Sequence, residues 1–500
     1  MDIDPFRPLY HFSPLTGFMN DPNGLVYFEE EYHLFYQWTP EGGKQHWGHA
    51  VSPDLLRWQD LEVALAPDEL GSIWSGSAVV DENDASGFFG GRPGLIAAYT
   101  NQNHETPPHG PQAQSIAYSA DRGRTWTKHQ GNPVAPNPGI PDFRDPKVFW
   151  HATTARWIMI LAAGCHAEIW TSRDLKEWAH ASSFGAAQGT PECVWECPDL
   201  FELPIENEPG QSRWVLAGSP IMPACYPLES TRTWCFVGAF DGTTFISETP
   251  ALEPLWVDYG RDNYASVTWA NAPGGRALWI GWMSDWDWTF QVPTQGWRSA
   301  MTLPRELTLR RTSGKLQFIQ RPIREIESVR TSIWEMSDVC LAPGEDPWGH
   351  VQGVALDISL EFEPGDASEV GVRVRVGSSE QTTIGYDAAA GRLFVDRTRS
   401  GQCDFHPRFS ERHDAPLPAR NGQISLRILV DACSVEVFAD DGALVMTDLI
   451  FPAAASRGLS LYSKDGACRI AHARISEVSR TVERPAHAES PAAGCDRQNP

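Results

Sequence analysis

In the last third of the chain, hydrophobic and polar residues alternate one by one. Within VALDISLEFEP (354–364) apolar side chains stand at every second position, and EVGVRVRVGS (369–378) and ISLRILVDACSVEVF (424–438) continue the pattern. A strand with one buried face has this period of two, because successive side chains point to opposite faces. Two such sheets can bury their apolar faces against each other, so we predict a β-sandwich over residues 350–480.

The first three hundred residues contain short apolar runs bounded by Gly and Pro, with almost no helical periodicity, and a weak repeat. The repeat is Ser-x-Asp followed by Trp four or five residues after the Asp. Its copies are SPDLLRW (52–58), SADRGRTW (119–126) and SRDLKEW (172–178), with AFDGTTF (239–245) as a degenerate fourth. An Asp-led turn followed by an aromatic residue is a natural end for a hairpin, so each copy marks one antiparallel unit. The copies recur about every 62 residues, and residues 10–310 then hold about five units, which predicts a five-bladed β-propeller.

The two patterns together predict an all-β chain, a five-bladed β-propeller followed by a β-sandwich domain. We assign residues 1–311 to the propeller and residues 350–480 to the sandwich. Residues 312–349, which include RPIREIESVR, are expected to be a linker with a short helix. The Pro- and Ala-rich residues 481–500 are expected to be a disordered tail. Two domains agree with a length of 500 residues, which exceeds what one core organises.

Composition narrows the class of partner. The formal net charge of −24 repels phosphate backbones and anionic lipid, so nucleic acid and membranes are not expected as partners. The 21 tryptophans favour carbohydrate, because indole rings stack on sugars. The acidic start MDIDPFRPLYHF has no signal pattern, which predicts a cytoplasmic protein as given, or a secreted one if a leader has been removed. Nothing in the sequence indicates the oligomeric state.

Three acidic residues stand directly before or near a proline at the entry to an apolar run. They are Asp21 in NDPNG, Asp145 in FRDPK and Glu196 in WECPDLFEL. Any one of these motifs alone is typical of a structural turn. The innermost strands of a propeller begin near its axis, so three such carboxylates are expected to converge on one pocket. Two carboxylates with opposed pKa values are the working groups of glycoside hydrolysis.

Seven motifs occur together in order, and their set resembles glycoside hydrolase family 32, the β-fructofuranosidases that include invertases, inulinases and levanases. The motifs are NDPNG, FYQ (35–37), WGHA (47–50), WSGSAV (74–79), FRDPK, ECPDLFEL and WRSAMTLPREL (297–307). The resemblance covers roughly residues 10–330, and VDACSVEVFADDG is similar to the sandwich domain of that family. It implies a five-bladed propeller with a β-sandwich, in agreement with the repeat.

The resemblance also implies roles for individual residues. Asp21 would be the nucleophile on the anomeric carbon of a terminal β-D-fructosyl unit, and Glu196 would be the general acid and then the base. Asp145, with Arg144 beside it, would hold two fructose hydroxyls and stabilise the transition state. Residues that match positions lining the fructose pocket are Asn20, Gln37, Trp47, Ser75, Asp262 and Trp286. This scheme retains configuration, so the carboxyl groups of Asp21 and Glu196 are expected ~5–5.5 Å apart.

Several tryptophans are expected either to form an aromatic rim around the pocket or to belong to the core: Trp38, Trp74, Trp286 and Trp297. No cofactor and no metal are expected, because the cysteines form no CxxC pairs and His46 and His49 lack an evident third ligand. The loop HETPPHG (104–110) is expected at the pocket mouth. The proline-rich segment 219–236 departs from the levanase-like pattern, which leaves the leaving-group subsites open.

Alternative functions remain at this point. SADRGRTW also fits the Asp-box pattern of sialidases, but a sialidase would leave the three carboxylate motifs unexplained. A non-catalytic carbohydrate-binding propeller would be expected to lack at least one of the carboxylates. A fructosyltransferase on the same scaffold, including one that forms a difructose anhydride, shares the covalent intermediate and cannot be separated by sequence. We expect an exo-acting fructosidase nearer to microbial levanases and exo-inulinases than to plant invertases. Its preference among levan, inulin and sucrose is left open.

Overall fold

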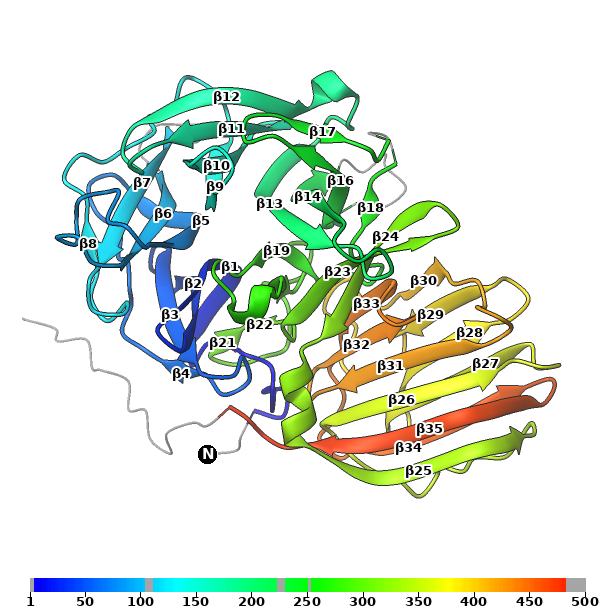
Figure 1. Cartoon of the computed structure of the whole chain (residues 1–500). Helices are drawn as coiled ribbons and strands as arrows, with labels where there is room; N and C mark the ends of the chain where they lie inside the picture. The colour runs from blue at the N-terminus through cyan, green and yellow to red at the C-terminus, as the bar shows by residue number, and fades with distance from the viewer. Residues whose placement is uncertain (1–3, 104–110, 223–229, 251–252, 483–500) are drawn as a thin grey trace, which may run out of the picture.

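In the computed structural model, the chain forms a ring of five small antiparallel sheets beside a two-sheet sandwich (Figure 1). The structure describes residues 4–103, 111–222, 230–250 and 253–482. Over these ranges helical structure is limited to three short 3-10 helices, η1 (Ala186–Gln188), η2 (Pro273–Gly275) and η3 (Arg324–Val329). None of the helices in the described part of the chain is long and apolar enough to cross a membrane. The predicted all-β class, a five-bladed propeller followed by a sandwich, is confirmed.

Each blade of the propeller is built from strands that follow one another along the chain. Blade 1 contains β1 (Gly17–Phe28), β2 (Glu31–Thr39), β3 (His46–Ser52) and β4 (Gln59–Asp60). Blade 2 contains β5 (Ser72–Asp81), β6 (Gly94–Gln102), β7 (Gln112–Ser119) and β8 (Thr127–Lys128). Blade 3 contains β9 (Phe143–His151), β10 (Arg156–Ala163), β11 (His166–Ser172) and β12 (Trp178–Gly185).

The last two blades have additional short strands. Blade 4 contains β13 (Val194–Pro204), β14 (Ser212–Met222), β16 (Trp234–Phe240) and β17 (Phe245–Ser247), with β15 (Ser230–Thr231) and β18 (Leu255–Trp256) at its edges. Blade 5 contains β19 (Tyr264–Thr268), β20 (Leu278–Met283), β23 (Arg305–Thr312) and β24 (Lys315–Pro322), and β22 (Ala300–Met301) pairs with β20. The short β21 (Trp297–Arg298) pairs in parallel with β1. The innermost strands β1, β5, β9, β13 and β19 contact one another in sequence, and β19 returns to β1, so the ring is closed.

The Ser-x-Asp repeat lies in the turn between the third and fourth strands of the blades, as a hairpin end. In blade 3 the Asp174 carboxylate accepts the N–H groups of Lys176 and Glu177, and the indole of Trp178 donates to the carbonyl of Leu175. Blades 1 and 2 repeat the indole bond with Trp58 and Trp126. The Asp-box-like SADRGRTW therefore has a structural role in an outer turn.

The sandwich follows the predicted alternation. One sheet has the order β25-β35-β26-β31-β32-β33 and the other β30-β29-β28-β27-β34. The strands are β25 (Arg330–Leu341), β26 (Leu356–Glu363), β27 (Glu369–Val376), β28 (Thr382–Asp387), β29 (Arg392–Asp396), β30 (Arg412–Pro416), β31 (Ile424–Val430), β32 (Ser434–Ala439), β33 (Leu444–Leu449), β34 (Gly458–Lys464) and β35 (Cys468–Val478). Their inward side chains, among them Ile358, Val372 and Val437, form one buried cluster.

Residues 312–349 do not form the expected linker, because most of them belong to strands of the two domains. Strand β24 is the last strand of blade 5, β25 is an edge strand of the sandwich, and only η3 and its flanks lie between them. The missed signal is the hairpin turn Ser313–Gly314, where both residues have positive φ (50° and 81°), as a two-residue type I′ turn requires. Of the expected tail, Thr481 and Val482 are buried and the Thr481 N–H donates to the carbonyl of Leu9; residues 483–500 lie outside the described ranges.

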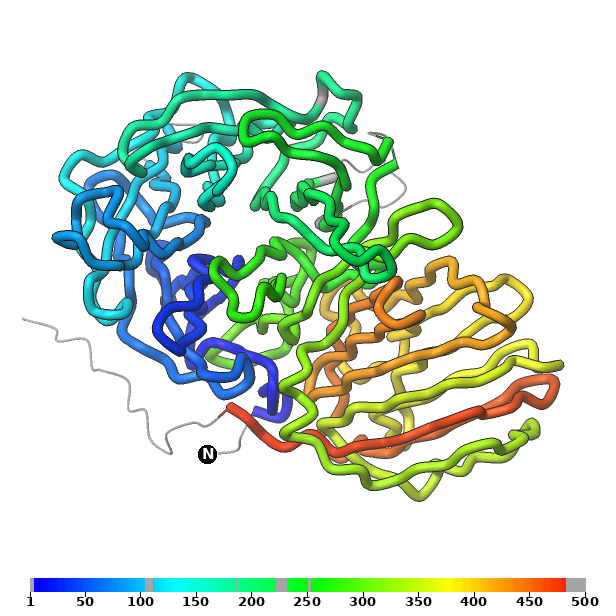
Figure 2. Tube along the Cα trace, viewed as in Figure 1, coloured from blue at the N-terminus to red at the C-terminus, as the bar shows by residue number. Residues whose placement is uncertain are grey.

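The N-terminal segment lies between the ring and the sandwich (Figure 2). His11 has Asp431 on Nδ1 and Glu436 on Nε2, both at 2.8 Å, and Glu436 also accepts a 2.7 Å bond from Arg305 of β23. These charged groups are almost fully buried, so each needs its partner. The two domains are therefore joined by buried ion pairs as well as by apolar contacts.

Candidate active site

The innermost strand of every blade is interrupted by an irregularity in its pairing. The shifts fall between Met19 and Pro22 in β1, Ile73 and Gly76 in β5, Arg144 and Lys147 in β9, Glu196 and Asp199 in β13, and Tyr264 and Val267 in β19. A bulge releases residues from the ladder and turns their side chains. It also tolerates proline, which has no N–H to give to a ladder, and this explains Pro146 and Pro198.

Three of these bulges have the same backbone geometry. Asp145, Cys197 and Ala265 have φ of 62°, 45° and 53°, a left-handed conformation that is uncommon for residues other than glycine. The N–H of each is bound by a side-chain oxygen of the preceding blade. Asp145 donates to Thr100 Oγ1 (2.9 Å), Cys197 to Asp145 Oδ2 (3.0 Å) and Ala265 to Ser219 Oγ (3.0 Å). The bulges are thus tied together around the axis.

This arrangement brings the three predicted carboxylates together. Asp145 Oδ2 accepts the Cys197 N–H, and the Cys197 thiol lies 3.5 Å from Asp21 Oδ2 and 3.8 Å from Asp145 Oδ2. Glu196 is the residue before Cys197. The three acidic groups therefore surround the bulge of β13, contributed by blades 1, 3 and 4.

Asp21 is held by neutral hydrogen-bond donors. Its Oδ2 accepts bonds from Ser75 Oγ (2.7 Å) and Gln37 Nε2 (3.3 Å), and its Oδ1 accepts one from Asn20 Nδ2 (3.1 Å). Burial holds the pKa of Asp21 above its ordinary value, although the bonds from Ser75, Asn20 and Cys197 act to lower it. The donors thus favour an ionised carboxylate in a buried place, which suits a nucleophile.

Arg144 lies between the other two carboxylates. Its Nη2 donates to Glu196 Oε1 (2.9 Å), its Nε lies 3.7 Å from Asp145 Oδ2, and Asp142 also binds the guanidinium. Burial opposes its charge, but the neighbouring carboxylates Glu196, Asp145 and Asp142 raise the pKa of Arg144 above its usual value. A permanently charged group therefore fixes the acidic cluster.

The cluster retains a proton more readily than isolated carboxylates would. Burial raises the pKa of Asp145 to about 7; Arg144 lowers it, while Glu196 and Asp21 raise it. Burial also raises the pKa of Glu196, with Asp21 adding to the effect and Arg144 opposing it. Such groups titrate together. Glu196 is the better placed to pass a proton to a bound molecule, because its side chain is 19% exposed and that of Asp145 only 6%.

Two further predicted residues border the site. The Trp74 ring lies 5.9 Å from the Arg144 guanidinium. Trp286 is half-buried against Phe18, at 6.1 Å between ring centroids, and Phe290 beside them is 53% exposed. Phe18 stands three residues before Asp21 on β1, so this aromatic group belongs to the same strand as the nucleophile candidate.

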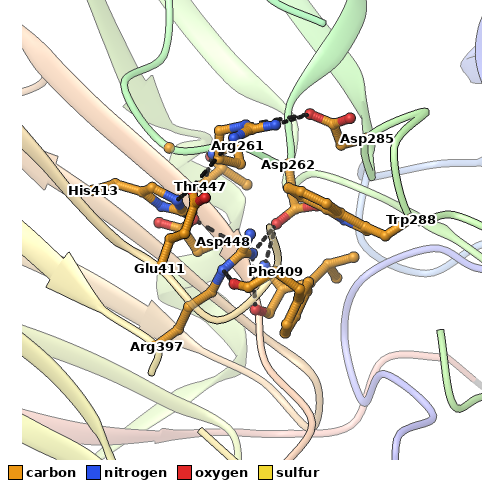
Figure 3. Close-up of polar contacts among 12 residues, drawn as sticks. Arg261, Asp262, Asp285, Trp288, Arg397, Phe409, Glu411, His413, Thr447 and Asp448 are labelled. Atoms are coloured by element: carbon orange, nitrogen blue, oxygen red, sulfur yellow. Dashed lines mark hydrogen bonds and ion pairs between the residues drawn. The ribbon is translucent and has the colours of Figure 1, made fainter. Parts of the chain in front are cut away.

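Other predicted residues lie elsewhere. Trp47 is 0% exposed and its indole donates to the Trp74 carbonyl (2.9 Å), so it supports the backbone beside Ser75. Asp262 is fully buried at the domain interface, where it accepts bonds from the Trp288 indole (2.9 Å), Arg397 (2.6 Å) and the Leu449 N–H (2.8 Å) (Figure 3). That both residues line a fructose pocket stays a prediction, because a motif match gives a position along the chain and not the side to which the residue turns.

The remaining predictions concern two tryptophans, two loop segments and the absence of a metal site, and parts of the loops lie outside the described residues. Trp297 is buried under Arg7 and is core, while the Trp38 indole donates to the Thr16 carbonyl. The loop 104–110 lies outside the described residues, as does 223–229 of the proline-rich segment. Among the residues that the structure describes, no group of three or more His, Cys, Asp or Glu is placed to hold a metal ion.

Sequence reasoning missed two residues at the site. Asn23 is fully buried and ties two strands together, because its Oδ1 accepts the Gly76 N–H (3.0 Å) and its Nδ2 donates to the Asp21 carbonyl (3.1 Å). Its place within NDPNG was a signal for this role. Tyr264 donates to Glu196 Oε2 at 2.6 Å, and no motif considered in the sequence indicated it.

Comparison with known proteins gives matches over nearly the whole chain. The family models "Glycosyl hydrolases family 32 N-terminal domain" and "Glycosyl hydrolases family 32 C terminal" match residues 11–322 and 323–477. A levanase of Bacillus subtilis (strain 168) is 48% identical over 93% of the chain and 69% of the levanase. An extracellular exo-inulinase of Aspergillus awamori is 37% identical over 95% of both chains. The crystal structure of exo-inulinase from Aspergillus awamori superposes with a TM-score of 0.89 at 35% identity, covering 96% of this chain and 99% of that one.

Proposed function

The chain belongs to glycosyl hydrolase family 32, and from that premise we propose that it is an exo-acting fructosidase that works through a covalent fructosyl intermediate. As a member with levanase and exo-inulinase relatives, it is a glycoside hydrolase that acts on fructans. The proposal extends this to the release of terminal β-D-fructofuranosyl units from fructans, fructo-oligosaccharides or sucrose. The observation that carries it is the convergence of Asp21, Asp145 and Glu196 on the bulge of β13.

In the first step, Asp21 attacks the anomeric C2 of the terminal fructosyl unit. The bond from C2 to the leaving oxygen breaks as Glu196 gives its proton to that oxygen, and an ester between Asp21 and C2 forms. The donors Ser75, Asn20 and Gln37 support this role by favouring the ionised form of Asp21 and by orienting it before attack.

In the second step, the ionised Glu196 takes a proton from a water molecule. That water attacks C2, the ester to Asp21 breaks, and fructose leaves with its configuration retained. Asp145 takes no part in bond making; its carboxylate accepts hydrogen bonds from fructose hydroxyls, and Arg144 fixes it beside Glu196.

Alanine variants and product analysis test this proposal. Asp21→Ala and Glu196→Ala are each expected to lower turnover by about 10³-fold or more while the thermal unfolding curve shows a folded protein. Wild-type protein with levan, inulin and sucrose is expected to release fructose. Substantial activity of Asp21→Ala would contradict the mechanism. A difructose anhydride or longer fructans as the main product would show the transferase alternative instead, and a disaccharide would show that release is not of single units.

A further inference from the structure

Glu196 is held from both sides by residues of the neighbouring blades. Arg144 of blade 3 donates to Oε1 (2.9 Å), and Tyr264 of blade 5 donates to Oε2 (2.6 Å). Both contacts are at hydrogen-bond distance, and the second is as short as bonds to an ionised oxygen usually are. Tyr264 is only 1% exposed, so its ring cannot leave this place easily.

The three residues occupy equivalent positions in their blades. Arg144 precedes Asp145, Glu196 precedes Cys197 and Tyr264 precedes Ala265, and the second residue of each pair has the left-handed backbone. The same bulge thus turns the three side chains toward one another. The repeated geometry of the propeller, and not a chance contact, places Tyr264 against Glu196.

The hydroxyl of Tyr264 has one hydrogen and two acceptors. Besides Glu196 Oε2 it lies 2.9 Å from the Ser219 carbonyl, which can only accept. When Glu196 is ionised, Tyr264 can donate to it. When Glu196 carries its proton on Oε2, the acid can donate to the Tyr264 oxygen, and the hydroxyl then donates to Ser219. Both protonation states of Glu196 are satisfied by one rotation of a hydroxyl.

We propose that Tyr264 is a positioning residue for the acid–base step, which orients Glu196 and stabilises it after it has given up its proton. This role rests on the proposed function. Within the described ranges, the charged and titratable groups that face Glu196 are Arg144 and Asp145 from β9, Asp21 from β1, Cys197 from its own strand and Tyr264 from β19. Tyr264 is the member of this group that exchanges a hydrogen bond with each state.

The variant Tyr264→Phe removes only the hydroxyl. The ionised form of Glu196 then loses a donor, so the alkaline limb of the pH profile of kcat/KM on levan is expected to move up by about one pH unit. The value of kcat is expected to fall about tenfold. For an aryl β-D-fructofuranoside, whose leaving group needs little protonation, kcat/KM is expected to fall much less than for levan.

Tyr10→Phe is the matched control. Tyr10 is equally buried, and its hydroxyl donates to a backbone carbonyl, that of Val430, at the domain interface. It is expected to leave the limb in place. An unmoved alkaline limb in a folded Tyr264→Phe enzyme overturns the proposal for Tyr264 alone, whereas a wild-type protein that releases no fructose from levan, inulin or sucrose overturns the proposed function.

Incorporation of 3-fluorotyrosine at position 264 keeps the test decisive if the phenylalanine variant does not fold. The fluorinated hydroxyl is a stronger donor, so the alkaline limb is expected to move down, in the opposite direction. A role in packing alone would leave the limb unchanged in this nearly isosteric protein, and that result would also overturn the proposal.

Discussion

Asp21 and Glu196 are both buried carboxylates, but their immediate surroundings differ in charge. Asp21 faces the neutral donors Ser75, Asn20 and Gln37, whereas Glu196 faces the cation Arg144 on one oxygen and the hydroxyl of Tyr264 on the other. Neutral donors stabilise an ionised carboxylate without forming a tight ion pair that would compete with attack on carbon. A hydroxyl that both donates and accepts serves a group that alternates between acid and base.

At this scale, Ser75→Ala tests the donors of Asp21. Loss of the 2.7 Å bond removes an interaction that lowers the pKa of Asp21, so the acidic limb of kcat/KM is expected to move to higher pH. Because a hydrogen bond to a charged group is lost, kcat/KM near pH 6 is expected to fall about tenfold or more. The pH profile on sucrose or levan measures both effects. Ser115→Ala, a fully buried serine in the third strand of blade 2, is the control; an acidic limb that moves equally in both variants would contradict this account.

The sequence predicted the three carboxylates because each stands before a proline-stiffened strand entry. It did not indicate that Trp47 packs in the core or that Asp262 lies at the domain interface. Which side of a strand a residue faces depends on bulges, and a bulge shifts the alternation without leaving a pattern in one sequence. Tyr264 was not predicted as a site residue for the same reason, since its contact with Glu196 depends on two bulges in different blades.

At the scale of the element, the bulge in β1 releases Asn20 and Asp21 from the ladder, and their side chains then bind Gln37 and Ser75. Gly24 follows on the same strand with φ of 57°, and a Cβ there would lie 2.4 Å from the Phe35 ring. Glycine is therefore needed for its backbone and for the close approach of Phe35. The blade count was predictable because the Asp-led turn recurs in the sequence, while the β23–β24 hairpin was missed because its Ser313–Gly314 turn lies outside the repeat.

Gly24→Ala and Gly42→Ala form a matched pair for this element. Both glycines have positive φ, but Gly42 (φ 69°) has nothing within 4 Å of an added Cβ. Gly42→Ala is expected to cost only about 1 kcal/mol of unfolding free energy and to keep kcat. Gly24→Ala adds a clash at β1 and is expected to cost more and to lower kcat. Urea unfolding and steady-state kinetics measure the two; equal effects in the pair would contradict the role of the close approach.

At the scale of the whole molecule, a buried network joins the propeller to the sandwich. Arg261 and Asp262, just before β19, contact Asp285, Glu411 and Arg397 (Figure 3). Because Asp262 stands two residues before Tyr264, the sandwich supports the strand whose tyrosine holds Glu196. The sandwich was predictable as a fold from its alternation, but its ion pairs with the propeller join residues far apart in the chain and left no sequence signal.

The contacts of His11 with Asp431 and Glu436, here called the His11 clamp, make the free energy of unfolding depend on pH. Bonds to Asp431 and Glu436 outweigh burial and raise the pKa of His11 to about 9 from its ordinary value of about 6.5. Since the folded pKa is the higher one, this stabilisation is full below pH 6.5 and is lost as the pH rises through 9. It is on the order of 3 kcal/mol.

His11→Gln is expected to lower the unfolding free energy more at pH 6 than at pH 10. The decrease in unfolding free energy from pH 6 to pH 10 is therefore expected to be smaller in the variant than in the wild type. Urea unfolding at the two pH values measures this difference. His180→Gln, an exposed histidine of β12, is the control and is expected to keep the wild-type fall. An undiminished fall in His11→Gln would contradict the clamp.

The central claim is that Asp21 forms a covalent bond to the fructosyl unit, and trapping with methanol tests it most directly. With levan in aqueous methanol, the account predicts that part of the released sugar is methyl β-D-fructofuranoside, because two displacements at C2 retain configuration. The product is stable and its anomer is read by NMR. Formation of the α anomer would show a single displacement and would contradict the covalent role of Asp21.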